Sequence, residues 1–389
     1  MIFAFTEPTQ LCLEISPEGQ SKSWQQSQDL STSSSCWNAY LNQICLNAVL
    51  PWLEEEYAPE VRIYPNAHES SSLWELVNGT SIIIGRRRLV LLPTEAMDED
   101  ELRVPQEWLD IPDWVGDYYL SAQINLDEQW VRIWGYTTHE QLKNRGSYNP
   151  RDRTYSLDGD DLIKDLNVLW VAQELCQEEQ TREAVAPLPS LSITQAKNLI
   201  ERLGNRETIT PRLEVPFTLW GALLENETWR RRLYQQRLGK VPVNLSQWFD
   251  NVFETGWYSL ESLLTDSGNL ALNFRGTQGL HEIEVKRVKL INLGKRLEYQ
   301  LAILLVGLNP EADQRKSISV QLHPTAGNRY LPAKIRLTLL SESGKILKSV
   351  EAKTQDNYIK IKRFKCLPGF QFGIQVSLDD CRITEDFVA

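Results

Sequence analysis

The chain has 389 residues, of which 42% are apolar and 24% charged, and its net charge is −11. This length exceeds the size at which single cores usually stop growing, and the composition argues against a disordered chain. Because the sequence contains no apolar run of about 18 residues and lacks the basic start of a secretory signal, we expect a soluble, cytoplasmic protein that does not enter a membrane.

Charge and tryptophan are unevenly distributed along the chain. Residues 1–264 include 22 basic and 39 acidic residues, a net charge of −17, whereas residues 265–389 include 19 and 13, a net charge of +6. All 13 tryptophans lie between Trp24 and Trp257. Two independent shifts at the same place predict a domain boundary near residue 264.

The N-terminal part shows the patterns of both strands and helices. The opening FAFTEPTQLCLEIS predicts a strand that Pro8 keeps from the centre of a sheet. Apolar spacing from Trp37 to Trp52 predicts a helix that Pro51 ends or bends. Strands are predicted at 81–92, 118–125 and 129–136, and a helix at 158–177. These elements predict an acidic, tryptophan-rich α+β domain over residues 1–180.

The segment WLDIPDWVGDYYLSAQINLDEQWVRIWGY, residues 108–136, is rich in aromatic side chains. Alternation along a strand places Trp130 and Trp134 on one face and Val131 and Ile133 on the other. Because both faces then carry large apolar groups, we interpret the segment as a sheet covered by helices on at least one side. An aromatic cage for a ligand is the disfavoured alternative.

A second helical block follows TREAVAPLPSL, residues 181–191, whose prolines predict a linker. Helices are predicted at 192–203, 217–238 and 244–264. In the last of these, apolar residues recur at spacings of three and four from Leu245 to Leu264, and Asn244 with Gln247 resembles a capping pair. We therefore predict a helical segment over residues 190–264.

Residues 281–389 alternate as strands do. SISVQL, IRLTLL and FQFGIQVSL each place apolar side chains on one face, and SESG, residues 341–344, predicts a hairpin loop. In NYIKIKRFKC, Phe364 takes the apolar role that alternation assigns to Arg363, which predicts a β-bulge. About seven short strands indicate a basic, antiparallel β-sandwich. The expected fold class is α+β, with a mixed α/β N-terminal domain, a helical middle segment and this C-terminal sandwich.

No motif for a metal, a phosphate or another cofactor occurs, so we expect none of these and no enzymatic activity. The segment SLDGDD, residues 156–161, has its glycine in the wrong place for a calcium loop and predicts a helix cap. The alternative is a hydrolase that pairs Cys36 or Cys45 with His68 or His139.

Two basic groups are candidate partner-binding residues. Arg86 and Arg88 are predicted to share a strand face, where they could clamp an anionic partner or, as we favour, pair with the acidic surface. The densest positive patch consists of Lys360, Lys362, Arg363 and Lys365. For this patch a solvated face ranks first, a protein partner second and nucleic acid third, because the whole chain is acidic and few aromatic side chains there could stack on bases.

Three stretches of the sequence carry a resemblance to a known family: ELRVPQEWLDIPDWVGDYYLSAQINLDEQWVRIWGYTTHEQL, DRTYSLDGDDLIKDLNVLW, and the C-terminal series DNYIKIKRF, PGFQFGIQVSLDD and ITEDFVA. They resemble a cyanobacterial family known as domain of unknown function 1822, over most of the chain. The resemblance brings no catalytic residues. It implies a cytoplasmic cyanobacterial protein whose gene lies near those of caspase-like CHAT-domain proteins and sigma-factor-like proteins.

These observations together predict a non-enzymatic protein-interaction module. It would act as an adaptor, regulator or substrate in a signalling or defence-like system, with a CHAT-domain or sigma-factor-like protein as candidate partner. A Cys–His hydrolase and a nucleic-acid-binding protein that uses the C-terminal basic face are the alternatives.

Overall fold

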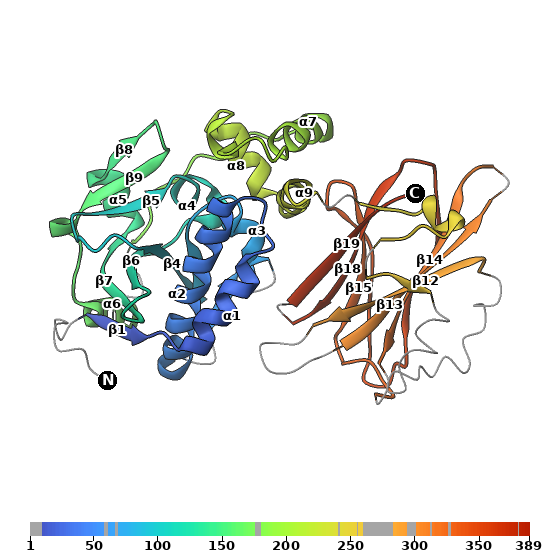
Figure 1. Cartoon of the computed structure of the whole chain (residues 1–389), viewed down its shortest axis with the longest axis horizontal. Coiled ribbons are helices and arrows are strands. Elements are labelled where there is room, and N and C mark those ends of the chain that lie inside the picture. The colour runs from blue at the N-terminus through green and yellow to red at the C-terminus, as the bar shows by residue number, and fades with distance from the viewer. Residues whose placement is uncertain are drawn as a thin grey trace. The chain divides into compact units, whose positions relative to one another are not determined.

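The chain divides into two compact units, Met1–Lys240 (unit 1) and Val241–Ala389 (unit 2), shown in Figure 1. Unit 1 mixes helices and strands, whereas unit 2 consists mainly of strands. Each unit has its own large hydrophobic core. The computed structural model describes residues 10–57, 61–66, 69–175, 180–239, 242–254, 256–259, 283–293, 301–311, 313–325, 328–379 and 381–389.

The described part of unit 1 contains helices and strands in an irregular order. In chain order they are β1 (Leu11–Glu14), α1 (Pro17–Ser27), α2 (Ser33–Tyr57), β2 (Val61–Tyr64), α3 (Ser70–Trp74), β3 (Thr80–Ile84), β4 (Arg87–Thr94), β5 (Glu101–Pro105), α4 (Glu107–Asp110), η1 (Pro112–Trp114), β6 (Tyr118–Asn125), β7 (Trp130–Thr138), α5 (His139–Arg145), β8 (Ser147–Asn149), β9 (Thr154–Asp158), η2 (Gly159–Asp161), α6 (Leu166–Leu175), α7 (Ile193–Leu203), η3 (Pro211–Leu213), α8 (Phe217–Glu225) and α9 (Glu227–Arg237).

A six-stranded sheet in the order β1-β7-β6-β4-β3-β2 forms the centre of unit 1, and α2 packs against it. Its neighbours are antiparallel except for β4 and β6. The strand β1 lies at an edge, as predicted. The single strand predicted over 81–92 is instead the hairpin β3–β4, because Gly85 takes a positive φ of 56° and turns the chain.

The aromatic segment 108–136 forms core, which confirms its interpretation. Trp108, Trp114 and Trp134 are at most 1% exposed. A register shift opposite Ser121 makes Trp134 an extra residue in β7, so it leaves the simple alternation on which the prediction relied. The indole rings of these three tryptophans therefore lie in the hydrophobic core of unit 1.

Residues 181–191 are bound to unit 1 and do not act as a free linker. The Thr181 side chain is buried, and the backbone carbonyl oxygen of Thr181 accepts a hydrogen bond from the Glu140 N–H (3.0 Å). The helices α7, α8 and α9 contribute to the same core as the sheet, so they belong to unit 1 and not to a separate helical segment. The helix predicted over 217–238 breaks at Asn226, whose side chain caps α9.

The described residues of unit 2 form two five-stranded sheets that share one core. Their orders are β10-β19-β18-β15-β16 and β11-β12-β13-β14-β17. Every pairing is antiparallel except β10 with β19, which is parallel. The elements are β10 (Val243–Asn244), η4 (Gln247–Asp250), β11 (Tyr258–Ser259), β12 (Val285–Asn292), β13 (Leu301–Pro310), β14 (Lys316–Pro324), β15 (Arg336–Ser341), β16 (Ile346–Glu351), β17 (Ile359–Cys366), β18 (Gln371–Leu378) and β19 (Cys381–Val388).

The helix predicted over 244–264 is wrong for the residues that the structure describes. They form β10, η4 and β11, and Asn251 ends η4 in the left-handed region at φ 58°. Trp248 and Trp257 pack on each other at 5.0 Å between ring centroids, and Trp257 packs on Phe387 at 5.6 Å. The apolar spacing therefore reflects burial in the core of unit 2, and the division of the chain lies earlier than the composition shift near residue 264.

The bulge predicted in β17 is confirmed. Ile318 of β14 faces Phe364, whereas Val320 faces Ile361. Lys362 and Arg363 thus both lie opposite one residue of β14, which is the definition of a bulge. The slip lets Phe364 pack against the core while the charged side chains point to solvent.

The buried His323 predicts that unit 2 loses stability in mild acid. Its ring stacks on Tyr358 at 5.4 Å, and burial lowers the pKa of His323 to about 4. Since the unfolded chain binds the proton more readily, stability falls as the pH drops from about 6.5 towards 4, by roughly 3 kcal/mol in all. Urea unfolding against pH should show a shallower slope for His323→Gln than for wild type. Parallel slopes would contradict the prediction.

Candidate interaction site

The four basic residues predicted from the C-terminal sequence are all exposed on β17. This strand is an edge of its sheet, and it contains the bulge at Lys362 and Arg363. Lys365 pairs with Glu311 at 2.8 Å. Lysine side chains and bulges are what proteins use to prevent edge strands from pairing with other chains. The positions of Lys360, Lys362, Arg363 and Lys365 therefore have a structural explanation that requires no partner.

Arg86 and Arg88 do not share a strand face, in contrast to the prediction. Arg86 is exposed in the turn between β3 and β4, because the strand is interrupted there. The guanidinium of Arg88 lies 4.1 Å from the centre of the Tyr64 ring and donates a hydrogen bond to the carbonyl oxygen of Asp113. The Arg88 side chain thus makes these contacts within unit 1.

A buried carboxylate, Asp117, joins β4 to the segment that follows α6. It accepts hydrogen bonds from Arg182 Nη2 (2.6 Å), the Thr181 hydroxyl (2.7 Å), the Arg88 backbone N–H (2.7 Å) and Arg87 Nη1 (3.2 Å). Burial alone would raise the pKa of Asp117, but the hydrogen bonds from Arg182 and Thr181 outweigh it and hold the pKa below its ordinary value. The cluster attaches residues 181–183 to the core.

Replacing Asp117 by asparagine is expected to release residues 181–183. An amide cannot accept all of these hydrogen bonds, and it leaves Arg182 without its ion pair. Hydrogen exchange of the backbone amides there should accelerate about tenfold or more, since a hydrogen bond to a charged group contributes roughly 1.5–3 kcal/mol. Asp127→Asn, at an exposed turn, is the matched control. Equal exchange in both variants would show that the cluster does not hold the segment.

Of the residues that the hydrolase alternative names, Cys36 directs its thiol to the backbone carbonyl oxygens of Gln28 (3.7 Å) and Leu30 (3.9 Å). Cys45 is fully buried, and burial raises the pKa of its thiol to about 12. His139 Nδ1 accepts from the Glu183 N–H, and Nε2 lies 3.0 Å from the Leu109 carbonyl oxygen, so both ring nitrogens contact backbone groups. His68 lies outside the described residues.

Within the described ranges, no three His, Cys, Asp or Glu side chains gather as metal ligands, and no helix is long and apolar enough to cross a membrane. The acidic segment SLDGDD forms a cap, since Asp158 accepts a hydrogen bond from the Asp160 N–H (3.0 Å) and begins the 3₁₀ turn η2. It borders a hollow of about 420 Å³ whose lining includes Asp100 and Asp161. Asp158 thus caps only this turn, and the start of the helix predicted over 158–177 is wrong, because α6 begins at Leu166.

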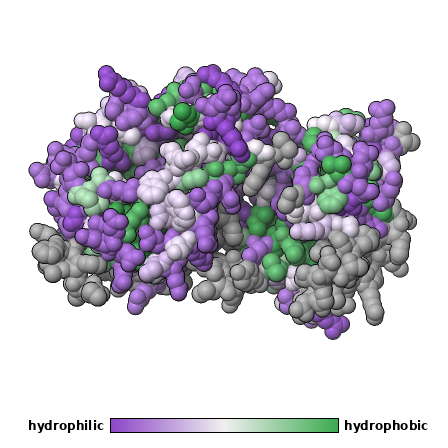
Figure 2. Space-filling view, viewed as in Figure 1, coloured by the Kyte–Doolittle hydropathy of each residue, from purple (hydrophilic) through white to green (hydrophobic). Residues whose placement is uncertain are grey.

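A second surface hollow contains two tryptophans that sequence reasoning did not select. Of the 13 tryptophans only Trp24 on α1 and Trp37 on α2 are more than a third exposed, at 45% and 39%. Their rings meet edge to face, with 6.1 Å between centroids and 74° between planes, and both contact Tyr40. In the view of Figure 2, hydrophilic side chains dominate the surface of unit 1, with paler side chains of intermediate hydropathy between them.

The hollow has a volume of about 440 Å³ and lies where α1 leads into α2. Its lining combines two indole rings with hydroxyl and amide side chains. The indole Nε1 of Trp37 donates to Glu95 Oε2 at 2.7 Å, which fixes its ring against the loop after β4. The lining residues are Trp24, Gln28, Leu30, Ser31, Thr32, Ser33, Cys36 and Trp37.

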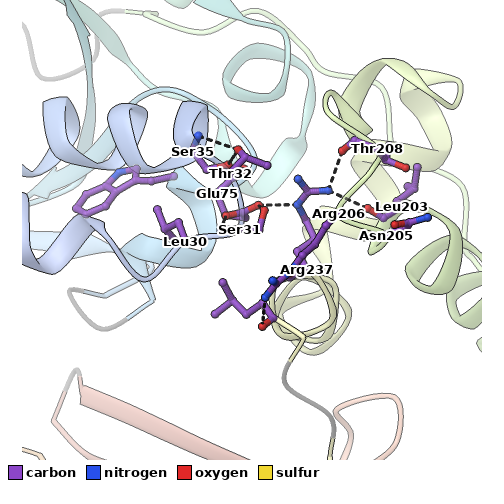
Figure 3. A network of polar contacts seen from close by, with 12 residues as sticks. Leu30, Ser31, Thr32, Ser35, Glu75, Leu203, Asn205, Arg206, Thr208 and Arg237 are labelled. Atoms are coloured by element: carbon purple, nitrogen blue, oxygen red, sulfur yellow. Dashed lines mark hydrogen bonds and ion pairs between the residues drawn. The ribbon is translucent and has the colours of Figure 1, made fainter.

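A buried polar network holds Ser31, one of the lining residues of the hollow (Figure 3). The Ser31 N–H donates to Glu75 Oε2 (3.0 Å), its hydroxyl donates to Glu75 Oε1, and Arg237 Nε of α9 donates to the same carboxylate (2.6 Å). The Thr32 hydroxyl accepts from the Ser35 N–H (3.1 Å) and so caps α2. The loop is therefore held in one conformation before any partner arrives.

One sequence signal could have indicated the hollow. The segment PEGQSKSWQQS of α1 contains a single large apolar residue, Trp24. A helix whose buried residues are Ser23 and Ser27 has little apolar surface of its own to bury, so its tryptophan is conspicuous. Nothing in the local pattern shows that Trp24 meets Trp37, because that contact depends on how α1 folds back on α2.

Comparison with known proteins gives one match. A family model described as "Protein of unknown function (DUF1822)" matches residues 13–388, so the match extends over both units. No curated protein matches the chain. No solved structure matches it either.

Proposed function

The chain belongs to the DUF1822 family, and from that premise we propose that it is a non-enzymatic protein-interaction protein that binds its partner at the tryptophan hollow of unit 1. The exposed contact between Trp24 and Trp37 is the observation that supports this function. Tryptophan is the residue most enriched among those that dominate binding energy at protein interfaces. Serine side chains beside aromatic rings also occur in the binding loops of antibodies, where they form adaptable hydrogen bonds.

The rigidity of the hollow favours binding. Because Glu75 already holds Ser31 in place, a partner need not order this loop when it docks. The proposed roles are those of an adaptor, regulator or substrate in a signalling or defence-like system of a cyanobacterial cytoplasm, with a CHAT-domain or sigma-factor-like protein as candidate partner. In the same proposal, the two sheets of unit 2 form a β-sandwich that supplies a second, basic module.

A photo-crosslinking experiment tests the proposed function. A benzoylphenylalanine at position 33, in the lining of the hollow, should form a discrete protein adduct in native lysate. The same group at position 127, at an exposed turn of unit 1, should not. The adduct at 33 should disappear in the Trp24→Ala/Trp37→Ala variant, provided that its thermal unfolding shows an intact fold.

Two outcomes count against this function. Identical adducts from positions 33 and 127 would mean that the surface captures proteins without preference. An adduct at 33 that survives in the double tryptophan variant would mean that the rings do not contribute to binding.

A further inference from the structure

The surroundings of the hollow are rich in negative charge. Residues 1–61 contain one basic residue, Lys22. Asp29 lies between two lining residues and is exposed, and Glu95, which holds Trp37, is followed in the same exposed loop by Asp98. The aromatic lining of the hollow is thus flanked by carboxylates, with Asp29 next to Gln28 and Leu30 in the chain and Glu95 in contact with Trp37.

These three carboxylates have no basic side chain within 4.0 Å among the residues that the structure describes, apart from the indole contact of Glu95. Their neighbour Glu99 behaves differently, since it pairs with Arg132 at 2.9 Å and Lys164 at 3.4 Å. Glu99 is thus compensated internally, whereas Asp29, Glu95 and Asp98 remain available to a cation from outside.

The ring geometry fits a cation as well. Because Trp24 and Trp37 meet at 74°, the face of one ring is not covered by the face of the other. An aromatic face attracts a cation, and tryptophan attracts it most strongly. An arginine guanidinium can stack on the ring and donate to a nearby carboxylate at the same time. Aliphatic or acidic segments could not use the carboxylates.

We propose that the occupant of the hollow is an arginine- or lysine-bearing segment of a partner protein, an inference that rests on the proposed function and specifies its partner. A guanidinium or ammonium group lies over the exposed indole faces, and Asp29, Glu95 and Asp98 surround it. The hydroxyl group of Ser33, which also lines the hollow, binds the backbone of the segment. The partner is therefore recognised by a basic side chain and not by an apolar anchor alone.

Fluorescence anisotropy of the full chain with a labelled peptide of alternating glycine and arginine tests this inference. A peptide with citrulline in place of arginine keeps the shape and removes the charge. The arginine peptide should bind about tenfold more tightly or better, as expected for a partly desolvated cation over tryptophan. The Trp24→Ala/Trp37→Ala variant should weaken its binding to a similar extent.

Two triple variants separate the site from the overall acidity of the protein. Asp29→Asn/Glu95→Gln/Asp98→Asn removes three charges at the hollow, and Glu54→Gln/Glu55→Gln/Asp127→Asn removes three from exposed positions elsewhere in unit 1. The first triple variant should weaken binding of the arginine peptide about tenfold. The second should weaken it by less than about twofold, because exposed charges farther away than a Debye length of roughly 8 Å are screened at physiological salt.

Each outcome supports or overturns the inference. Equal losses in both triple variants, or equal binding of the citrulline peptide, would overturn it, as would full competition by tetramethylammonium, which would indicate a site for small cations. If the crosslinked adduct forms at position 33 but the arginine peptide does not bind, the proposed function stands and this inference fails. If the peptide binds and no adduct forms, the proposed function fails instead.

Discussion

Replacement of Arg237 by methionine is expected to lower the free energy of unfolding of unit 1 by about 3–5 kcal/mol, the usual cost of removing one partner of a buried ion pair. The side chains of Arg237 and Glu75 are 1% and 0% exposed. Arg237 also donates to the carbonyl oxygens of Leu203 and Thr208, each at 3.1 Å. The variant therefore leaves a buried negative charge and two backbone acceptors without this donor. Urea unfolding at neutral pH measures the loss.

A second substitution distinguishes the charge from the packing. Adding Glu75→Gln to Arg237→Met removes the unpaired buried charge, and the amide oxygen of the new glutamine can still accept from the Ser31 N–H. The double variant should therefore recover part of the stability that Arg237→Met loses. Arg202→Met is the control, because Arg202 is exposed and lies 3.9 Å from Glu214. If Arg237→Met costs no more than Arg202→Met, the network is not stabilising.

The same network couples stability to the proposed binding site. Glu75 holds both Arg237 of α9 and Ser31 in the lining of the hollow. A variant that loosens this carboxylate should therefore also weaken binding at the hollow, although Arg237 lies on another helix. Pre-organisation lost in this way appears as a lower affinity without any change in the exposed tryptophans.

Local patterns predicted the elements whose formation depends on neighbours in sequence. Alternation and its interruption identified β6, β7 and the bulge at Lys362 and Arg363 correctly. The helix predicted over 192–203 is present as α7, and Ser192 caps it in a reciprocal pair with Gln195. These features need only side-chain direction and backbone hydrogen bonding within a few residues.

Tertiary contacts decided what the patterns could not. The Glu75–Arg237 pair joins residues 162 positions apart, and no local signal marks either as buried. Conversely, the basic cluster of β17 was the densest positive patch in the sequence. Its position on an edge strand explains the lysine side chains without any bound partner, because they prevent the edge from pairing with another chain. The candidate site instead depends on the exposure of Trp24 and Trp37, which only the packing of α1 on α2 determines.

Trp248 and Trp257 show most clearly how tertiary contacts set the boundary of unit 2, because both are buried in its core. A fragment that begins at Val241 is expected to fold by itself, whereas one that begins at residue 265, where the composition changes, is not. The shorter fragment lacks Trp248 and Trp257, both buried against Phe387. Truncating one such side chain costs about 3–5 kcal/mol, so losing both removes most of a domain's usual 5–15 kcal/mol.

Circular dichroism and urea unfolding of the two fragments measure this difference. The longer fragment should unfold in one cooperative transition, and the shorter one should show none. Phe387→Ala in the longer fragment serves as an intermediate case, because it keeps both tryptophans but removes a ring that both of them contact. It should shift the transition without abolishing it. Cooperative unfolding of the shorter fragment would mean that the two sheets do not need these aromatic side chains, and the boundary suggested by charge and tryptophan content would then be the physical one.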